Sequence, residues 1–309
     1  MRPQRAHSYL TPVADSKRWD NWRPRGGDII VCTPPKAGTT WTQMICALLV
    51  HQTQELPLPL TQLSRWLERH SEPIDKVIAD YESQDFRRIV KTHTPLDGLP
   101  YFDDAFYVYC GRDPRDAFLS AADHLENFSD ASHADANRRA NVPADFRFPK
   151  DLNTFFQMWL TLPTQDWVPD GFPMGSVLYH ASSFWPHRTL PNILFVHYDD
   201  LSAGLEEVMR RISDFLHIPI NDHVFSSLVE AARFSAMKES GSQNAPGAHI
   251  GEWRDPSAFF KKARHGEWRT VLTPENLQLY DRIANERLDP VLRNWLEHGQ
   301  RIAGDPREI

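Results

Sequence analysis

The sequence has few cysteines and no excess of basic residues. Its three cysteines, Cys32, Cys46 and Cys110, lie in apolar runs without CxxC spacing, which predicts buried free thiols rather than a metal site or a disulfide. The formal net charge is -7, from 34 basic and 41 acidic side chains, so we expect no nucleic-acid partner. This pattern is typical of a reducing compartment, and we expect a cytoplasmic location.

Long apolar runs are also missing. The longest, MICALLV at residues 44–50, is far shorter than the roughly 20 residues that cross a bilayer. The N-terminal residues contain no apolar stretch typical of an export signal. We therefore expect no transmembrane segment, while peripheral contact with a membrane stays open.

Strand and helix patterns alternate along the 309 residues, whose hydrophobic content of 41% allows one large domain over residues 1–309. Short apolar segments rich in β-branched and aromatic residues predict buried strands at 28–33, 105–110 and 192–198, with a weaker candidate at 87–93. Helices are predicted over 205–216, from Asp113, and finally from Thr273. The alternation predicts an α/β fold with a central, mostly parallel sheet flanked by helices, and ligands at the carboxyl ends of its strands.

Two polar stretches, residues 126–150 and 239–258, interrupt this alternation. Long loops in a compact domain are either lids and binding loops or disordered connectors, and both interpretations stay open here. We expect both stretches to be mobile.

The stretch CTPPKAGTTW, residues 32–41, follows the first predicted strand and precedes a helical pattern. Backbone amides and a helix N-terminus would converge there on an anion, as in a P-loop-like phosphate-binding loop. However, Lys36 precedes Gly38, and the GK[ST] of a Walker loop is absent. An ordinary turn between strand and helix is the alternative.

The wording PKAGTTW resembles the PKSGTTW signature of the sulfotransferases that use 3′-phosphoadenosine 5′-phosphosulfate (PAPS), with Ala37 at the usual serine. Further blocks resemble the same family in the same order: RRIVKTHTPLDGLP (87–100), YVYCGRDPRDAFLS (107–120), GSVLYHASSFW (175–185), ILFVHYDDL (193–201), ARFSAMK (232–238) and FFKKARHGEW (259–268). The resemblance covers residues 25–285, and its wording is most similar to bacterial glycolipid sulfotransferases.

The resemblance implies PAPS as co-substrate and no metal. It assigns the 5′-phosphosulfate to the loop, the 3′-phosphate to Arg112 and Ser120, and adenine to Trp41 and Phe234. The complete implied set is Lys36, Ala37, Gly38, Thr39, Thr40, Trp41, Arg112, Ser120, Tyr198, Phe234, Lys261, Lys262 and Ala263.

Some of these residues have other possible roles. Arg112 could instead pair with Asp113 or Asp116, and Trp41 could simply belong to the core. The triplet at 261–263 departs from the family's Arg-Lys-Gly, which removes a bidentate phosphate ligand.

Three catalytic roles follow from the resemblance. His93 is the expected general base, because imidazole titrates near neutrality, while Lys36 would stabilise the leaving phosphate and Lys91 the sulfonate. Without the family context, His93 and Lys91 would be ordinary solvated side chains at a strand end. We also expect His124, four residues after Ser120, to line the acceptor pocket.

The function predicted in this way is in-line transfer of a sulfo group from PAPS to a hydroxyl acceptor, which is a glycolipid or a small phenol or alcohol. Two alternatives remain: an ATP-dependent P-loop kinase with Asp199 and Asp200 as metal ligands, and a nucleotide-binding protein without activity. The stretch RTVLTPENLQ (269–278) departs from the KxxxTVxxxE dimer motif of animal cytosolic members, so it gives no basis for that mode of dimerisation, and the oligomeric state stays open.

Overall fold

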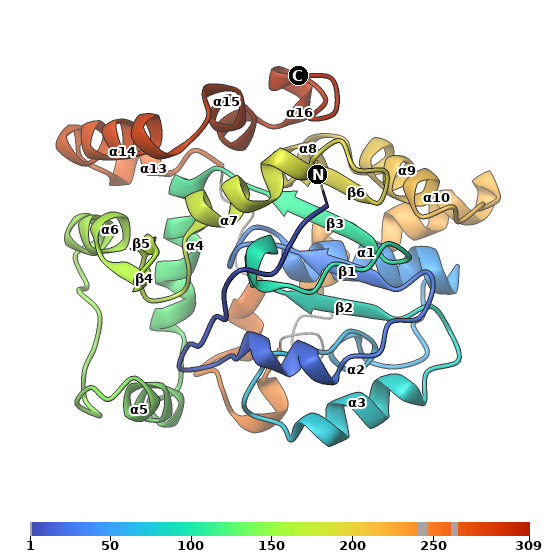
Figure 1. Ribbon diagram of the computed structural model, residues 1–309, viewed down its shortest axis with the longest axis horizontal. Helices are drawn as coiled ribbons and strands as arrows, with labels where there is room; N and C mark the ends of the chain where they lie inside the picture. Colours follow the sequence, from blue (N-terminus) through green and yellow to red (C-terminus); the bar gives the residue numbers. More distant parts are fainter. Residues whose placement is uncertain (1, 240–245, 261–264) are drawn as a thin grey trace.

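The central sheet has four parallel strands in the order β2-β1-β3-β6 (Figure 1). The computed structural model describes residues 2–239, 246–260 and 265–309. The strands are β1 (Ile29–Cys32), β2 (Ile89–Thr92), β3 (Phe106–Gly111) and β6 (Ile193–His197), which confirms the four predicted strands and the α/β fold.

The remaining described elements are mostly helices, together with one antiparallel strand pair. In chain order they are η1 (Ser16–Asn21), α1 (Thr39–His51), α2 (Leu60–Leu63), α3 (Ile74–Glu82), η2 (Leu96–Gly98), α4 (Pro114–Glu126), α5 (Asp130–Arg139), α6 (Leu152–Thr161), β4 (Pro163–Gln165), β5 (Val168–Gly171), α7 (Val177–Phe184), η3 (Trp185–His187), α8 (Tyr198–Ala203), α9 (Leu205–Phe215), α10 (Asp222–Ala231), α11 (Phe234–Glu239), η4 (Ala248–Ile250), η5 (Pro256–Phe260), α13 (Trp268–Val271), α14 (Pro274–Arg287), α15 (Pro290–His298) and α16 (Gln300–Ala303).

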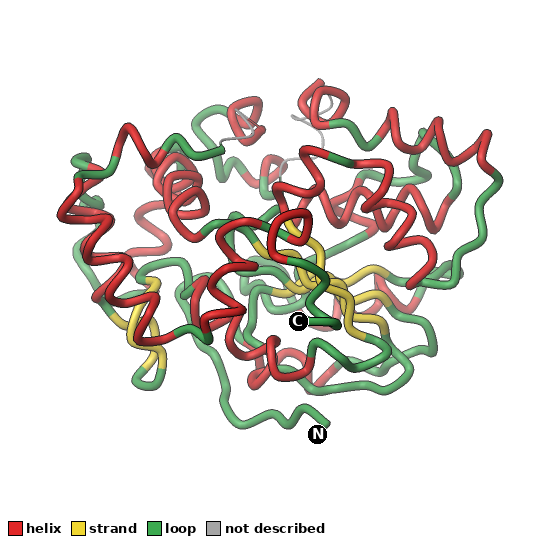
Figure 2. The backbone as a smooth tube through the Cα atoms, turned by 90° about the horizontal axis from the view of Figure 1, so that it is seen from above, coloured by secondary structure: helices red, strands yellow, loops and turns green. Residues whose placement is uncertain are grey.

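Each strand sends alternate side chains to opposite faces of the sheet, and each face supports its own core. In β1, Ile30 and Cys32 join one buried cluster, while Ile29 and Val31 join the other. Helices α4, α6, α7, α14 and α15 cover the first face, and α1, α9 and α10 cover the second. Figure 2 shows the strands enclosed between helices on both sides. Burial on both faces explains why the strands are almost continuously apolar.

The predicted helix starts at Asp113 and Thr273 are confirmed, since both side chains accept hydrogen bonds from backbone N–H groups of their helices. The expectation that the helix from Thr273 is the last one is wrong. The side chain of Asp289 likewise accepts hydrogen bonds from backbone N–H groups and caps a further helix, α15, which has Pro290 in its first turn.

Residues 126–150 are not a continuous loop, because they contain α5. Ser129 caps this helix, and its inward face buries only the polar residues His133 and Asn137, so no apolar stripe marks it in the sequence. Figure 1 shows α5 away from the sheet, with a long extended connection leading from it to α6. Residues 239–258 contain η4 and part of η5. The mobility of both stretches stays a prediction.

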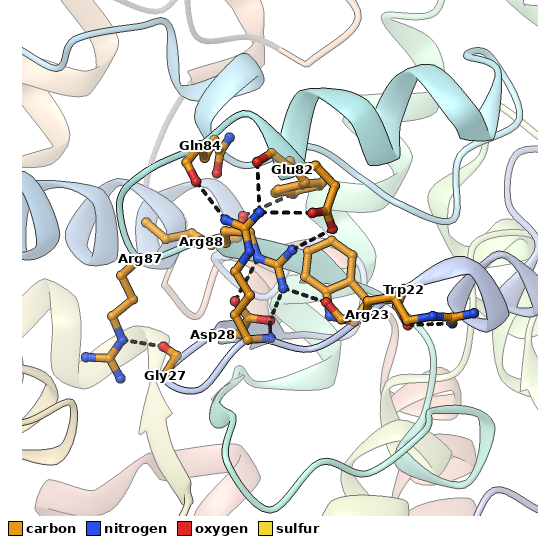
Figure 3. A network of polar contacts seen from close by, with 11 residues as sticks. Trp22, Arg23, Gly27, Asp28, Glu82, Gln84, Arg87 and Arg88 are labelled. Carbon is orange, nitrogen blue, oxygen red and sulfur yellow. Dashed lines mark hydrogen bonds and ion pairs between the residues drawn. The ribbon is translucent and has the colours of Figure 1, made fainter.

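A buried ion pair joins the starts of β1 and β2 (Figure 3). The guanidinium of Arg88 donates through Nε and Nη2 to Asp28 at 2.9 and 2.6 Å, and it lies 4.0 Å above the ring of Trp22. The same Nη2 donates to the carbonyl oxygen of Arg23 at 2.8 Å. This network fixes the two strands side by side, so that their carboxyl ends reach the same edge of the sheet.

All three cysteines are free and buried, as predicted. Within the described ranges, no helix has the length and apolar character needed to cross a membrane.

Candidate active site

The carboxyl ends of all four strands open into one cavity of about 460 Å³. Lys36 and Gly38 reach it from the loop after β1, His93 from the end of β2, Arg112 from the end of β3 and Tyr198 from the end of β6. From β1 the chain continues to β2 on one side, and it then crosses over to β3 on the other side of β1. Such a topological switch point is where open α/β sheets bind ligands.

The loop after β1 has the tight geometry of an anion-binding turn. Lys36 has a φ of 68° and Gly38 a φ of 94°, and Gly38 caps the N-terminus of α1. A Cβ on Gly38 would lie 2.9 Å from Cδ2 of Tyr198, so glycine is required for this close approach. The hydroxyl groups of Thr33 and Thr39 form a hydrogen bond of 2.6 Å across the loop. Ala37 is buried, while Thr39, Thr40 and Trp41 line the cavity.

Among the residues that the structure describes, four cationic side chains line the cavity: Lys36, Lys91, Arg69 and Arg112. Burial, together with the nearby Arg112, lowers the pKa of Lys36 to about 7. Burial and the charge of Arg69 lower the pKa of Lys91 to about 8. Crowding of buried positive charge is unfavourable without a counter-ion, so this half of the cavity is suited to an anionic ligand.

His93 has a defined tautomer. Its Nδ1 lies 2.9 Å from the carbonyl oxygen of Thr33, which can only accept, so Nδ1 carries the proton and Nε2 presents its lone pair. Burial, followed by the charge of Lys91, lowers the pKa of His93 to about 3. The ring is therefore neutral at physiological pH and able to accept a proton at Nε2.

Lys36 also contacts His124, which lines the same cavity. The two nitrogens lie 3.1 Å apart, and His124 Nδ1 accepts because the lysine nitrogen carries only donors. Burial and the charge of Lys36 lower the pKa of His124 well below its usual value. This contact holds the Lys36 side chain against another residue of the cavity lining.

Arg112 and Ser120 both line the cavity, on either side of the start of α4. The guanidinium of Arg112 donates to the carbonyl oxygen of Lys36 at 2.8 Å and lies 4.1 Å above the ring of Tyr198. Asp113, one alternative partner, is instead engaged by Arg115 through two hydrogen bonds. Arg112 therefore links the loop after β1 to the end of β6.

Trp41 and Phe234 lie together at the edge of the cavity, but they do not form the parallel pair that a base stacked between them requires. Their ring centroids are 5.9 Å apart with an interplanar angle of 64°, and the indole N–H donates to the carbonyl oxygen of Ala232 at 2.8 Å. The two rings pack edge to face, so a stacked base has no space between them in this arrangement. The remaining predicted donor-site residues, Lys261, Lys262 and Ala263, lie outside the described residues.

The far half of the cavity is apolar, and no motif in the sequence marks the individual residues of its wall. Its side chains come from the end of α4, from the stretch after α5 and from the segment around β5: Leu125, Phe128, Val142, Phe146, Phe148, Val168, Phe172 and Met174. The only signal in the sequence is the recurrence of phenylalanine within the polar stretch 126–150. Trp66, Glu68 and Arg69 were also missed.

The acidic residues that a kinase would need have other partners. Asp200 accepts hydrogen bonds from the backbone N–H groups of Gln300 and Arg301, and Asp199 forms an ion pair with His265. Within the described part of the chain, no group of three or more His, Cys, Asp or Glu side chains is arranged to hold a metal ion.

The sequence of this chain is similar to that of one known protein family. The family model described as the sulfotransferase domain matches residues 26–291. A glycolipid sulfotransferase of Mycobacterium bovis is 34% identical over 310 residues, which cover 95% of this chain and 94% of that protein. A glycolipid sulfotransferase of Mycobacterium tuberculosis is also 34% identical, with the same coverage.

Solved structures show the same fold at lower sequence identity. A mouse sulfotransferase complexed with PAP has a TM-score of 0.68 at 20% identity, covering 90% of this chain and 91% of that one. Retinol dehydratase in a complex with retinol and PAP has a TM-score of 0.69 at 20% identity, covering 90% and 87%.

Proposed function

Because this chain belongs to the sulfotransferase family, we propose that it transfers a sulfo group from PAPS to a hydroxyl acceptor, with His93 as the general base. The observation that carries the proposal is the hydrogen bond from His93 Nδ1 to the Thr33 carbonyl oxygen, which leaves Nε2 free to take a proton beside two lysines. A neutral imidazole with this tautomer is suited to deprotonating an acceptor hydroxyl.

The proposed reaction is an in-line displacement at sulfur. His93 Nε2 takes the proton of the acceptor hydroxyl as its oxygen forms a bond to sulfur. The bond between sulfur and the bridging phosphate oxygen breaks, and adenosine 3′,5′-bisphosphate (PAP) leaves with the bonding electrons. Lys36 neutralises the charge on that bridging oxygen, and Lys91 neutralises the sulfonate oxygens.

The choice of PAPS is supported by the cationic half of the cavity and by the structural neighbours that hold PAP. The loop after β1 offers backbone amides and Lys36 to a 5′-phosphosulfate, and Arg112 with Ser120 offers a fork and a hydroxyl to a 3′-phosphate. An ATP-dependent kinase lacks such support, because Asp199 and Asp200 are engaged elsewhere.

We propose a glycolipid as the acceptor. The apolar half of the cavity is suited to an acyl or similar hydrocarbon chain, and both mycobacterial relatives are named glycolipid sulfotransferases. Three large apolar side chains of the cavity lining, Leu10, Val13 and Val142, are also exposed, at 64%, 38% and 37%. They would allow the cytoplasmic protein to touch a membrane that holds the acceptor. A small phenol or alcohol remains the alternative.

The donor can be tested by calorimetric titration of the protein with PAP and with ATP, in the presence of a metal chelator. We expect PAP to bind and ATP to bind much more weakly. Transfer of a labelled sulfo group from PAPS is then measured with a glycolipid and with a simple phenol. Binding of ATP that appears when excess Mg²⁺ replaces the chelator, without binding of PAP in either condition, would reject the proposal in favour of the kinase.

A further inference from the structure

Glu68 is a buried carboxylate that lines the cavity and accepts hydrogen bonds from several directions. Its Oε1 accepts from Trp19 Nε1 at 2.7 Å, from Thr92 Oγ1 at 2.5 Å and from Thr94 Oγ1 at 2.7 Å. Its Oε2 accepts from Trp66 Nε1 at 2.8 Å. Only 1% of the residue is exposed, so its charge is satisfied by these donors rather than by solvent.

These donors surround the catalytic end of β2. Thr92 and Thr94 flank His93, whose own backbone N–H lies 3.4 Å from Glu68 Oε2. Trp66 packs edge to face against the His93 ring, with centroids 5.0 Å apart. The Lys91 ammonium lies 5.0 Å from the centre of the Trp66 ring. One carboxylate therefore reaches both His93 and Lys91 through their immediate neighbours.

We propose that Glu68 is a positioning residue, which holds the end of β2 and the Trp66 indole so that His93 and Lys91 face the reacting groups. The inference rests on the proposed function, because it assigns these two residues to catalysis. Positioning of this kind matters because a displacement of about 1 Å at a catalytic group costs about 10²-fold in rate.

The surroundings of Glu68 require a hydrogen-bond acceptor at both of its carboxylate oxygens. Each oxygen of Glu68 receives an indole N–H, from Trp19 on one side and from Trp66 on the other. An indole N–H only donates, and a glutamine side chain presents one oxygen and one NH₂ group. Whichever way the amide is turned, its NH₂ would face an indole donor. Threonine hydroxyls could rotate to compensate, but a tryptophan cannot.

The test compares Glu68→Gln with Glu230→Gln, a substitution in an exposed carboxylate that pairs with Arg233. We expect Glu68→Gln to lower kcat by about 10²-fold while the calorimetric affinity for PAP changes by less than about threefold, because the loop and Arg112 are untouched. Glu230→Gln should behave as wild type. Turnover of Glu68→Gln within about threefold of wild type would overturn the proposal.

The pH profile separates positioning from loss of stability. Arg69, Glu252 and Glu68 are the charged groups that act on Lys91, and the charge of Glu68 raises the pKa of that lysine. Glu68→Gln should therefore move the alkaline decline of kcat/KM to lower pH, which general destabilisation does not do. An unmoved alkaline limb, together with unchanged turnover, would contradict the assignment.

Trp66→Phe serves if Glu68→Gln does not fold, because it keeps an aromatic ring, although a smaller one, beside His93 and removes the N–H that binds Glu68. We expect a loss of kcat of about tenfold, without loss of PAP binding. Nitrogen-15 shifts of the His93 ring provide a readout that does not depend on turnover, since they report the tautomer. A wild-type protein that transfers no sulfo group would reject the proposed function, whereas an unchanged His93 tautomer and unchanged ring environment in both variants would reject the positioning role.

Discussion

Two lysines and one histidine should determine the pH dependence of this enzyme. Burial lowers the pKa of Lys36 to about 7, that of Lys91 to about 8 and that of His93 to about 3. In the proposed mechanism the lysines act as cations, which lose their charge as the pH rises through these values, whereas His93 acts as a neutral base, which is protonated only in acid. We expect kcat/KM for PAPS, which reports the free enzyme, to stay level down to about pH 5 and to decline between about pH 7 and 9.

An initial-rate series from pH 5 to 10 at constant ionic strength measures this profile, and circular dichroism checks that the protein stays folded throughout. A fall on the acid side with a midpoint near 6.5 would mean that the histidine retains its ordinary pKa, against the burial seen here.

Replacing His93 by alanine should separate catalysis from binding. General-base catalysis typically contributes about 10²–10⁴-fold, so turnover should fall by that factor. The affinity for PAP should stay close to that of wild type, because the imidazole contacts the loop after β1 at the Thr33 carbonyl oxygen, whereas Arg112 contacts it separately at the Lys36 carbonyl oxygen. His223→Ala, in an exposed residue at the start of α10, is the control. Turnover near wild type in the His93 variant would remove this residue as the base.

At the scale of elements, the sequence predicted the parts that carry their own local signal. The four strands were recognisable because burial on both faces makes them short, continuous apolar runs. Helix α5 was missed because its buried residues, His133 and Asn137, are polar. Strands β4 and β5 were missed because Pro163, Pro169 and Gly171 are typical of turns rather than strands.

The same distinction applies to the site. His93 and Arg112 follow predicted strands, and parallel strands bring their carboxyl ends to one edge, so their convergence could be expected. Glu68 and the apolar wall come from segments without periodicity or motif, and only tertiary packing places them at the cavity. Family resemblance added the roles of individual residues, but not the edge-to-face packing of Trp41 and Phe234.

The segment after α5 should select the acceptor rather than the donor. Val142 lines the apolar half of the cavity and is 37% exposed, so Val142→Asp should cost little stability but disfavour a hydrocarbon chain. Loss of about 1.5 kcal/mol of apolar burial raises KM for a long-chain glycolipid by about tenfold. KM for PAPS and for a small phenol should stay unchanged.

Val291→Asp is the matched control, since Val291 is 42% exposed on α15 and is absent from the described cavity lining. Equal effects of the two variants on glycolipid KM would show that added charge, rather than the cavity wall, is responsible.

At the scale of the whole molecule, both cores depend on the same four strands, because alternate residues of each strand face opposite sides. Strands β1 and β2 are separated by more than fifty residues of chain, and the buried pair of Arg88 and Asp28 fixes their starts together. We predict that residues 1–309 form a single domain, and that urea therefore unfolds it in one transition.

Asp28→Asn should destabilise this whole assembly. The substitution removes the charge opposite a guanidinium whose side chain is 0% exposed, and breaking one partner of a buried pair costs about 3–5 kcal/mol of unfolding free energy. Arg210 pairs with Glu206 at the surface, so Glu206→Gln should cost much less. Urea denaturation followed by tryptophan fluorescence measures both. If the two variants lost equal stability, the pair between β1 and β2 would be dispensable, and the alignment of His93 with the anion-binding loop would have to come from the strand hydrogen bonds alone.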